Sequence, residues 1–223
     1  MYGIKENLRY YFWATYRRKN LDVLLAKNEY HYKGVVLDVG GRDRGRFKKP
    51  KNRVEKWIFA DIEEKYKPDM IVDITNMSGV ETESIDVVNA IEIFEHVDDV
   101  ERALSECYRV IKKNGTLMLS APFLYPVHAD PFDYERWTND KWEKALIRAG
   151  FTIEKIEIMG RFFTVLADMN KTFVRSMPRP LKKALYFSYP ILDLLTKLDD
   201  LRSVKNHPTF GRFHQGYFIV AKK

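Results

Sequence analysis

Five short apolar runs constrain the fold of this chain more than any other feature of its sequence. They are rich in Val, Ile and Leu and alternate little with polar residues, a pattern typical of strands that are buried on both faces. Strands of that kind are typical of parallel sheets, because the crossover helices that connect parallel strands cover both faces of the sheet. The predicted strands are GVVLDV (34–39), KWIFAD (56–61), DMIVDI (69–74), IDVVNAI (85–91) and GTLMLSAP (115–122).

Helical patterns accompany these runs. Apolar residues recur on one face from Asp98 to Lys113, where Asp98 is a suitable N-cap, and a second helix is predicted between Thr138 and Gly150. Segments 151–160 and 216–223 are typical of two more strands. We expect one domain over 1–223, with a helical leader at 1–33, a core at 34–160, a helical insertion at 161–213 and a last strand at 214–223.

The composition of the chain indicates the chemical class of its partner and the cellular compartment in which we expect it. The net charge of +7 favours an anionic partner, such as a phosphate-bearing substrate, an acidic membrane surface or nucleic acid. The single cysteine, Cys107, excludes an intrachain disulfide and favours a reducing compartment, and the first twenty residues lack the apolar run of a secretory signal. We therefore expect a cytoplasmic protein. Residues 161–213 stay open to three interpretations: a lid, extra core packing, or peripheral contact at the inner face of a membrane.

The loop VVLDVGGRDRG (35–45) follows the first predicted strand and is typical of a nucleotide-cofactor site. Gly40 and Gly41 allow the backbone to turn sharply against a ligand. The carboxylate of Asp38 would repel a pyrophosphate but attract an ammonium and a sulfonium, so it favours S-adenosylmethionine over NAD. Asp61 ends the second strand, where it can accept ribose hydroxyls, and Asp73 ends the third, where it can accept the adenine amino group.

The motifs VVLDVGG, WIFADI, MIVDITN and AIEIFEHV…ALSECYRVIKKNG resemble those of class I S-adenosylmethionine-dependent methyltransferases (the methyltransferase type 11 group). The resemblance implies a Rossmann-like three-layer α/β sandwich with a seven-stranded, mostly parallel sheet of order 3-2-1-4-5-7-6, in which only the last strand is antiparallel. The chain departs from the family's glycine pattern at Arg42 and Arg44. The implied cofactor-binding residues are Asp38, Gly40, Gly41, Asp61, Ile62, Asp73, Ile74, Ala90, Ile91 and Glu92.

The segment PFLYPVHADPFDYERWT (122–138) follows the fifth predicted strand and is dense in polar and aromatic side chains. Its pattern from His128 to Thr138 resembles a branch of the superfamily found in cell-surface polysaccharide and glycan pathways. That resemblance implies O-methylation of a sugar hydroxyl in polysaccharide biosynthesis. Whether the acceptor is lipid-linked or phosphate-bearing stays open. The predicted catalytic residues are His128 as general base with Asp133 or Asp130 orienting it, and the predicted acceptor-binding residues are Tyr125, Tyr134 and Arg136.

A rival site and rival functions remain open. Glu92, Glu95 and His96 could supply a base or, with another carboxylate, hold a divalent ion. His128, Asp130 and Asp133 could also hold an ion, although we expect no metal. The alternatives to a glycan enzyme are methylation of a quinone, polyketide or other natural product, and a catalytically degenerate scaffold that binds only the cofactor or a partner. Nucleic acid is not expected as a substrate, because the fourth strand leads into NAIEIFEH and not into an Asp/Asn-Pro-Pro-aromatic motif.

Overall fold

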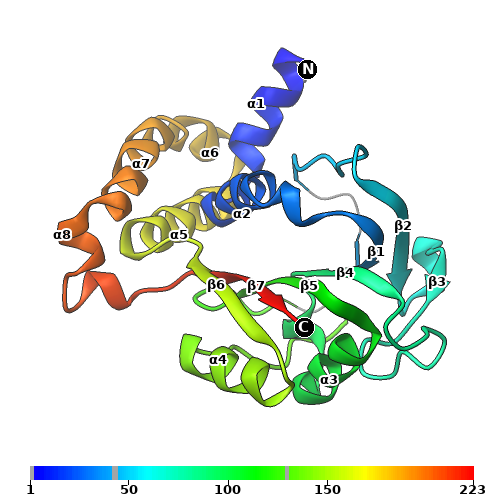
Figure 1. Cartoon of the computed structure of the whole chain (residues 1–223). Coiled ribbons are helices and arrows are strands. Elements are labelled where there is room, and N and C mark those ends of the chain that lie inside the picture. Colours follow the sequence, from blue (N-terminus) through cyan, green and yellow to red (C-terminus); the bar gives the residue numbers. More distant parts are fainter. Residues whose placement is uncertain (1–2, 42–44, 129–130) are drawn as a thin grey trace. The chain divides into compact units, whose positions relative to one another are not determined.

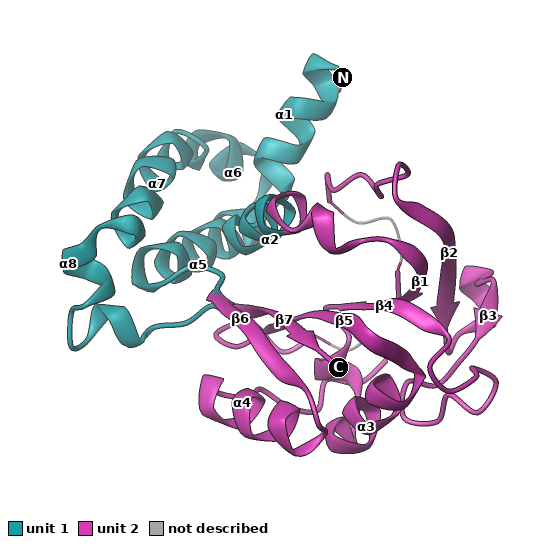
Figure 2. Cartoon of the chain, in the orientation of Figure 1, with its two compact units in different colours: residues 1–24, 158–215 teal, residues 25–157, 216–223 magenta. Residues whose placement is uncertain are grey.

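The chain divides into two units, each assembled from segments that lie far apart in the sequence (Figure 2). The computed structural model describes residues 3–41, 45–128 and 131–223. One unit, here the helical unit, combines the residues up to Leu24 with Ile158–Gln215. The other, here the sheet unit, combines Leu25–Glu157 with Gly216–Lys223.

A seven-stranded sheet forms the centre of the sheet unit (Figure 1). Its strand order is β3-β2-β1-β4-β5-β7-β6, and β7 runs antiparallel to β5, whereas β1, β2, β3, β4 and β5 pair in parallel. This confirms the predicted Rossmann-like fold and strand order. The strands are β1 (Gly34–Val39), β2 (Val54–Asp61), β3 (Met70–Ile71), β4 (Ile85–Ile91), β5 (Ile111–Pro122), β6 (Thr152–Ile158) and β7 (Gly216–Lys222).

The central strands are buried along most of their length, as their apolar runs predict. In β1, Val36 and Leu37 are fully buried, and Val36 pairs with Trp57 of β2 on one side and Val87 of β4 on the other. This register places the carboxyl ends of β1, β2 and β4 at one edge of the sheet, where a parallel sheet binds ligands.

Two helices of the sheet unit, α3 (Val100–Val110) and α4 (Asn139–Arg148), lie on the same face of the sheet (Figure 1). The cap of α4 is Thr138, as predicted, and its side chain accepts a hydrogen bond from the Lys141 amide. The prediction of Asp98 as the cap of α3 is wrong by one residue. Asp99 takes that position and accepts from the Arg102 amide, and α3 ends at Val110 because β5 begins at the next residue.

The third predicted strand, 69–74, is much shorter than its apolar run. Asp69 accepts a hydrogen bond from the Phe59 amide, and Asp73 accepts two from Thr75, so local side-chain bonds confine β3 to Met70 and Ile71. The connection from β3 to β4 is built of turns, and β2 reaches β3 through the short 3-10 helix η2 (Glu64–Tyr66). Two further 3-10 helices, η1 (Glu29–His31) and η3 (Phe94–His96), belong to the same unit.

The helical unit joins the leader to the predicted insertion. Tyr16 and Tyr189 pack in its core, and Lys171 is buried with its ammonium donating to the carbonyls of Tyr11 and Ala14. No helix in the described parts of the chain has the length and apolarity needed to cross a membrane. The unit contains α1 (Ile4–Trp13), most of α2 (Tyr16–Lys27), α5 (Phe162–Ser176), α6 (Arg179–Leu185), α7 (Ser188–Thr196), η4 (Lys197–Asp200), α8 (Arg202–Lys205) and η5 (Phe210–Arg212).

Candidate active site

A pocket of about 470 Å³ opens at the carboxyl ends of β1, β2 and β3. Six of the residues predicted from the sequence line it: Gly40, Asp61, Ile62, Asp73, Ile74 and Tyr134. Several residues that the sequence did not suggest also line it: Val39, Glu63, Val72, Thr75, Ile93, Val97, Asp98, Pro131 and Phe132. His96, named above only as part of a rival site, completes the wall.

The turn after β1 requires glycine for two different reasons. Gly40 has a φ of +62°, and a Cβ atom there would lie 2.0 Å from Cδ1 of Ile93. A Cβ on Gly41 would lie 2.1 Å from the carboxyl carbon of Asp38. The protein's own packing thus excludes a side chain at both positions, and Gly40 also lines the pocket. Arg42 and Arg44 lie outside the described residues.

Asp38 lies beneath this turn and already binds cationic and amide donors. Its Oδ2 is 2.9 Å from Nζ of Lys49, and its Oδ1 accepts a 2.6 Å hydrogen bond from the Asn89 amide group. Asn89 is fixed in turn by a hydrogen bond from the Tyr32 hydroxyl. Because the Asp38 side chain is 3% exposed, its charge needs such partners. Asp38 is thus paired with a lysine ammonium of this chain and is not among the pocket-lining residues, so its predicted contact with the cofactor stays a prediction.

Asp61 and Asp73 also stabilise the turns in which they lie. Oδ1 of Asp61 accepts from the Glu63 amide, and Oδ1 of Asp73 accepts from both the amide and the hydroxyl of Thr75. These are ordinary turn contacts for aspartate. Since both residues line the pocket as well, a structural role and a ligand-binding role coexist at each position.

Three predicted cofactor residues, Ala90, Ile91 and Glu92, lie at the end of β4 and are not among the pocket-lining residues. Ala90 is fully buried, and Glu92 accepts a 2.8 Å hydrogen bond from the Ser120 hydroxyl of β5. Glu92 adopts a φ of +59°, so the chain turns sharply there. The pocket wall after β4 is formed by residues that follow this turn, from Ile93 to Asp98.

The loop after β5 holds the predicted catalytic residues close together. The Asp133 carboxylate accepts from the His128 amide at 2.8 Å and from Nη2 of Arg136 at 2.6 Å, and its Oδ2 is 3.4 Å from Nδ1 of His128. The Arg136 guanidinium holds the pKa of Asp133 down at about 2, and burial lowers the pKa of His128. Tyr125 packs edge-on against the His128 ring. Asp130 lies outside the described residues.

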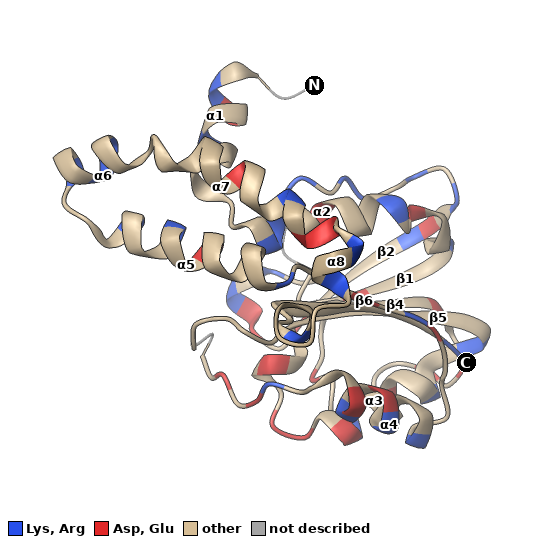
Figure 3. Ribbon diagram, turned by 90° about the vertical axis from the view of Figure 1, so that its left-hand side faces the viewer, with Lys and Arg blue, Asp and Glu red and all other residues tan. Residues whose placement is uncertain are grey.

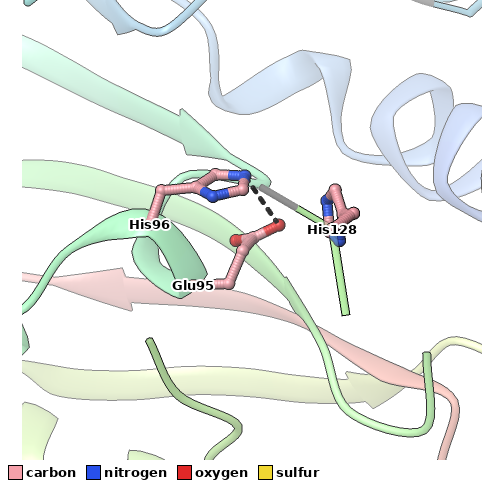
Figure 4. Close-up of side chains that lie close together, drawn as sticks. All are labelled: Glu95, His96 and His128. Atoms are coloured by element: carbon pink, nitrogen blue, oxygen red, sulfur yellow. Dashed lines mark ion pairs between the residues drawn. The ribbon is translucent and has the colours of Figure 1, made fainter. Parts of the chain in front are cut away.

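This loop is bound directly to η3. The Tyr134 amide donates to the Glu95 carbonyl at 2.8 Å, and Nδ1 of His96 bonds to the Phe132 carbonyl. The His96 and His128 rings consequently lie 5.2 Å apart, with Glu95 beside them (Figure 4). His96 and His128, which the sequence assigned to rival sites, therefore belong to one site.

Comparisons with known proteins agree with this geometry. Residues 25–119 match a family model described as "Methyltransferase domain". A search of curated protein sequences found no match.

Solved structures share the fold at low sequence identity. A structure described as a SAM-dependent methyltransferase from Archaeoglobus fulgidus is 17% identical, with a TM-score of 0.56 over 99% of this chain and 100% of that one. The [4+2]-cyclase SpnF is 15% identical, with a TM-score of 0.58 over 91% and 79%. Phosphoethanolamine N-methyltransferase 2 from Haemonchus contortus, in complex with S-adenosyl-L-methionine, is 18% identical, with a TM-score of 0.51 over 92% of this chain and 52% of that one. The chain is therefore similar to a methyltransferase domain over residues 25–119, and its fold is similar to that of structures described as SAM-dependent methyltransferases.

Proposed function

We propose that this protein transfers a methyl group from S-adenosylmethionine to a hydroxyl of a sugar in a glycan, polysaccharide or glycosylated intermediate. One observation carries the proposal: the His128 imidazole is positioned by Asp133 and stands 5.2 Å from His96, which lines the pocket. A hydroxyl acceptor must lose a proton during transfer, and an imidazole beside the pocket can take it.

The reaction assigns a task to each part of the site. The acceptor oxygen forms a bond to the methyl carbon, while the carbon–sulfur bond breaks and its electron pair returns to sulfur. His128 takes the hydroxyl proton, and the products are a methyl ether and S-adenosylhomocysteine. Asp133 keeps the imidazole oriented, and the Asp133–Arg136 pair fixes the loop, so much of the rate is expected to come from positioning.

Residues of the pocket support the assignment of the cofactor's parts. Asp61, Asp73 and Ile74 line the pocket. We assign Asp61, at the end of β2, to the ribose hydroxyls, and Asp73 with Ile74 to the adenine. Asp38 would bind the ammonium of the methionine part by displacing Lys49.

Features of the acceptor side favour a polar ring. The Phe132 and Tyr134 rings lie 5.5 Å apart at the pocket, and aromatic faces pack against the apolar faces of sugars. Arg136, expected to bind the acceptor, is engaged by Asp133, so we assign it to loop positioning.

We also propose that the helical unit contacts a membrane surface, which would suit a lipid-linked acceptor. Lys and Arg occur along α1 and α6 (Figure 3), and apolar side chains are exposed on the same unit. A surface with both kinds of residue suits an anionic lipid interface. The exposed apolar residues of α5 and α7 are Leu166, Met169, Phe173, Ile191 and Leu194.

Two measurements test the proposed function. Calorimetry with S-adenosylhomocysteine should show binding with one site per chain, and an absence of heat at millimolar ligand would overturn the enzyme assignment. Radiolabelled cofactor should then transfer label to a glycan or glycolipid fraction of a cell extract. Label in RNA or in quinones, with none in glycans, would overturn the sugar assignment and leave the methyltransferase assignment intact.

A further inference from the structure

The cluster of Glu95, His96 and His128 has the composition and the spacing of a metal site (Figure 4). One ligand atom of each residue lies within 4.8 Å of the other two. Two imidazoles and one carboxylate form a donor set found in zinc enzymes and in non-haem iron sites, where it leaves coordination positions open.

The hydrogen bonds of both histidines leave the same nitrogen available. Nδ1 of His96 bonds to the Phe132 carbonyl, and Nδ1 of His128 lies 3.2 Å from the Pro126 carbonyl. A carbonyl only accepts, so each Nδ1 carries the proton and each Nε2 carries a lone pair. Metal-binding histidines characteristically donate their second nitrogen to a backbone carbonyl or carboxylate in this way.

Glu95 supplies the negative charge from a buried position. Its side chain is 1% exposed, and its Oε1 lies 3.9 Å from Nε2 of His96. The backbone of the same residue accepts from the Tyr134 amide, so η3 and the loop after β5 are held together at the cluster. The three side chains are thus set on two connected segments.

We propose that Glu95, His96 and His128 bind one divalent transition-metal ion at the wall of the pocket. An ion equidistant from three atoms 4.8 Å apart would lie about 2.8 Å from each, so the side chains would close by less than ~1 Å to reach the 2.0–2.2 Å of zinc bonds. Rotation of the half-exposed His128 side chain can supply that movement.

The site deepens the proposed function and rests on it only for its catalytic use. Because His96 lines the pocket, an open coordination position would face the acceptor. With the ion bound, a hydroxyl coordinated to it would have a lowered pKa and would pass its proton to water, while His128 would hold the ion. Without the ion, His128 would take the proton itself, as proposed above. This inference departs from the sequence-based expectation of no metal.

Binding is tested on the full, untagged chain after treatment with a chelator. Zn²⁺ titration by calorimetry should give one site per chain, and Co²⁺ should give the visible absorption of a low-symmetry site. His128→Gln and Glu95→Gln should each weaken Zn²⁺ binding at least tenfold, whereas His207→Gln, in the helical unit, should leave it unchanged. Circular dichroism establishes that each variant is folded. Because the His128 side chain is half-exposed, His128→Gln should disturb the fold less than Glu95→Gln does.

The outcomes separate the two proposals. Zn²⁺ binding that is absent, or that is equal in His128→Gln and the wild type, would overturn the metal site. Zn²⁺ binding with no binding of S-adenosylhomocysteine would overturn the proposed function and retain the metal site. Mg²⁺ serves as a comparison, and tighter binding of Mg²⁺ than of Zn²⁺ would also contradict the proposal, because imidazole ligands favour zinc.

Discussion

The ammonium of Lys49 lies 2.9 Å from the carboxylate of Asp38, directly below the turn at Gly41. The same ammonium donates to the Gly41 carbonyl at 3.3 Å, so Lys49 links Asp38 to the turn after β1. A cofactor that presents its own ammonium to Asp38 has to compete with Lys49.

Lys49→Met should therefore strengthen the binding of S-adenosylhomocysteine. We expect a Kd that is lower by up to about fivefold, because a partly exposed ion pair is worth about 1 kcal/mol or less. Calorimetry checks this, with Lys51→Met as a control for the loss of one positive charge on the same connection. Weaker binding in Lys49→Met would show that Lys49 holds Asp38 in position instead of competing for it.

Gly40→Ala should damage the turn itself. The new methyl group would meet Ile93 at 2.0 Å and would adopt an unfavourable φ of +62°, so the free energy of unfolding should fall by roughly 1–3 kcal/mol. Cofactor affinity should fall as well, since Gly40 and Ile93 line the pocket. Gly79→Ala is the matched control, because a Cβ atom there meets nothing within 4 Å. Equal melting temperatures for the two variants would contradict the packing argument.

His128→Gln should lower the rate of methyl transfer by about 10²- to 10⁴-fold, the range typical of a lost acid–base group. The affinity for S-adenosylhomocysteine should be nearly unchanged, since His128 is not among the pocket-lining residues. Single-turnover kinetics with labelled cofactor measure the first quantity, and calorimetry measures the second. A variant with full turnover would remove His128 from the proton-transfer step.

Lys171 should make the stability of the helical unit depend on pH. Burial, with a smaller contribution from Lys19, lowers its pKa from 10.5 to about 7, whereas Asp168 and Asp193 act in the opposite direction. Between pH 7 and 10.5 the unfolded state therefore holds more protons than the folded state. The free energy of unfolding should rise with pH in this window, by up to about 1.4 kcal/mol per pH unit.

The measurement compares chemical unfolding of the wild type with that of Lys171→Met from pH 6 to 9. The stability of the wild type relative to the variant should increase above pH 7, and the exposed Lys183→Met should show no such trend relative to the wild type. A difference that is constant with pH would mean that Lys171 keeps an ordinary pKa.

Much of the sheet could be predicted from the sequence, because burial on both faces leaves a direct mark on composition. The runs at 34–39 and 85–91 coincide with β1 and β4. The run at 69–74 could not be delimited in this way. The side-chain hydrogen bonds of Asp69 and Asp73 decide where β3 begins and ends, and apolar periodicity does not reveal them.

The site was predictable where it follows a strand end and unpredictable where it depends on contacts between loops. Asp61 and Asp73 line the pocket because parallel strands bring their carboxyl ends together. His96 and His128 lie close together because His96 bonds to the Phe132 carbonyl and the Tyr134 amide donates to the Glu95 carbonyl. These bonds join segments that are more than thirty residues apart in the sequence. The contact of Lys49 with Asp38 could not be predicted, because Lys49 lies in a segment with several basic residues and only the fold brings its side chain to Asp38.

The construction of the helical unit from two segments that lie far apart in the sequence also sets an order of events during synthesis. The ammonium of Lys171 donates hydrogen bonds to the carbonyls of Tyr11 and Ala14. Tyr11 and Ala14 are synthesised early, whereas Lys171 is synthesised only after β1 to β6. The aromatic side chains of the leader therefore stay exposed to solvent until strands β1 to β6 and then α5 have been synthesised. A bulky fusion at the amino terminus would act on this late step of assembly, so yield and solubility should respond to it more than the finished protein's stability does.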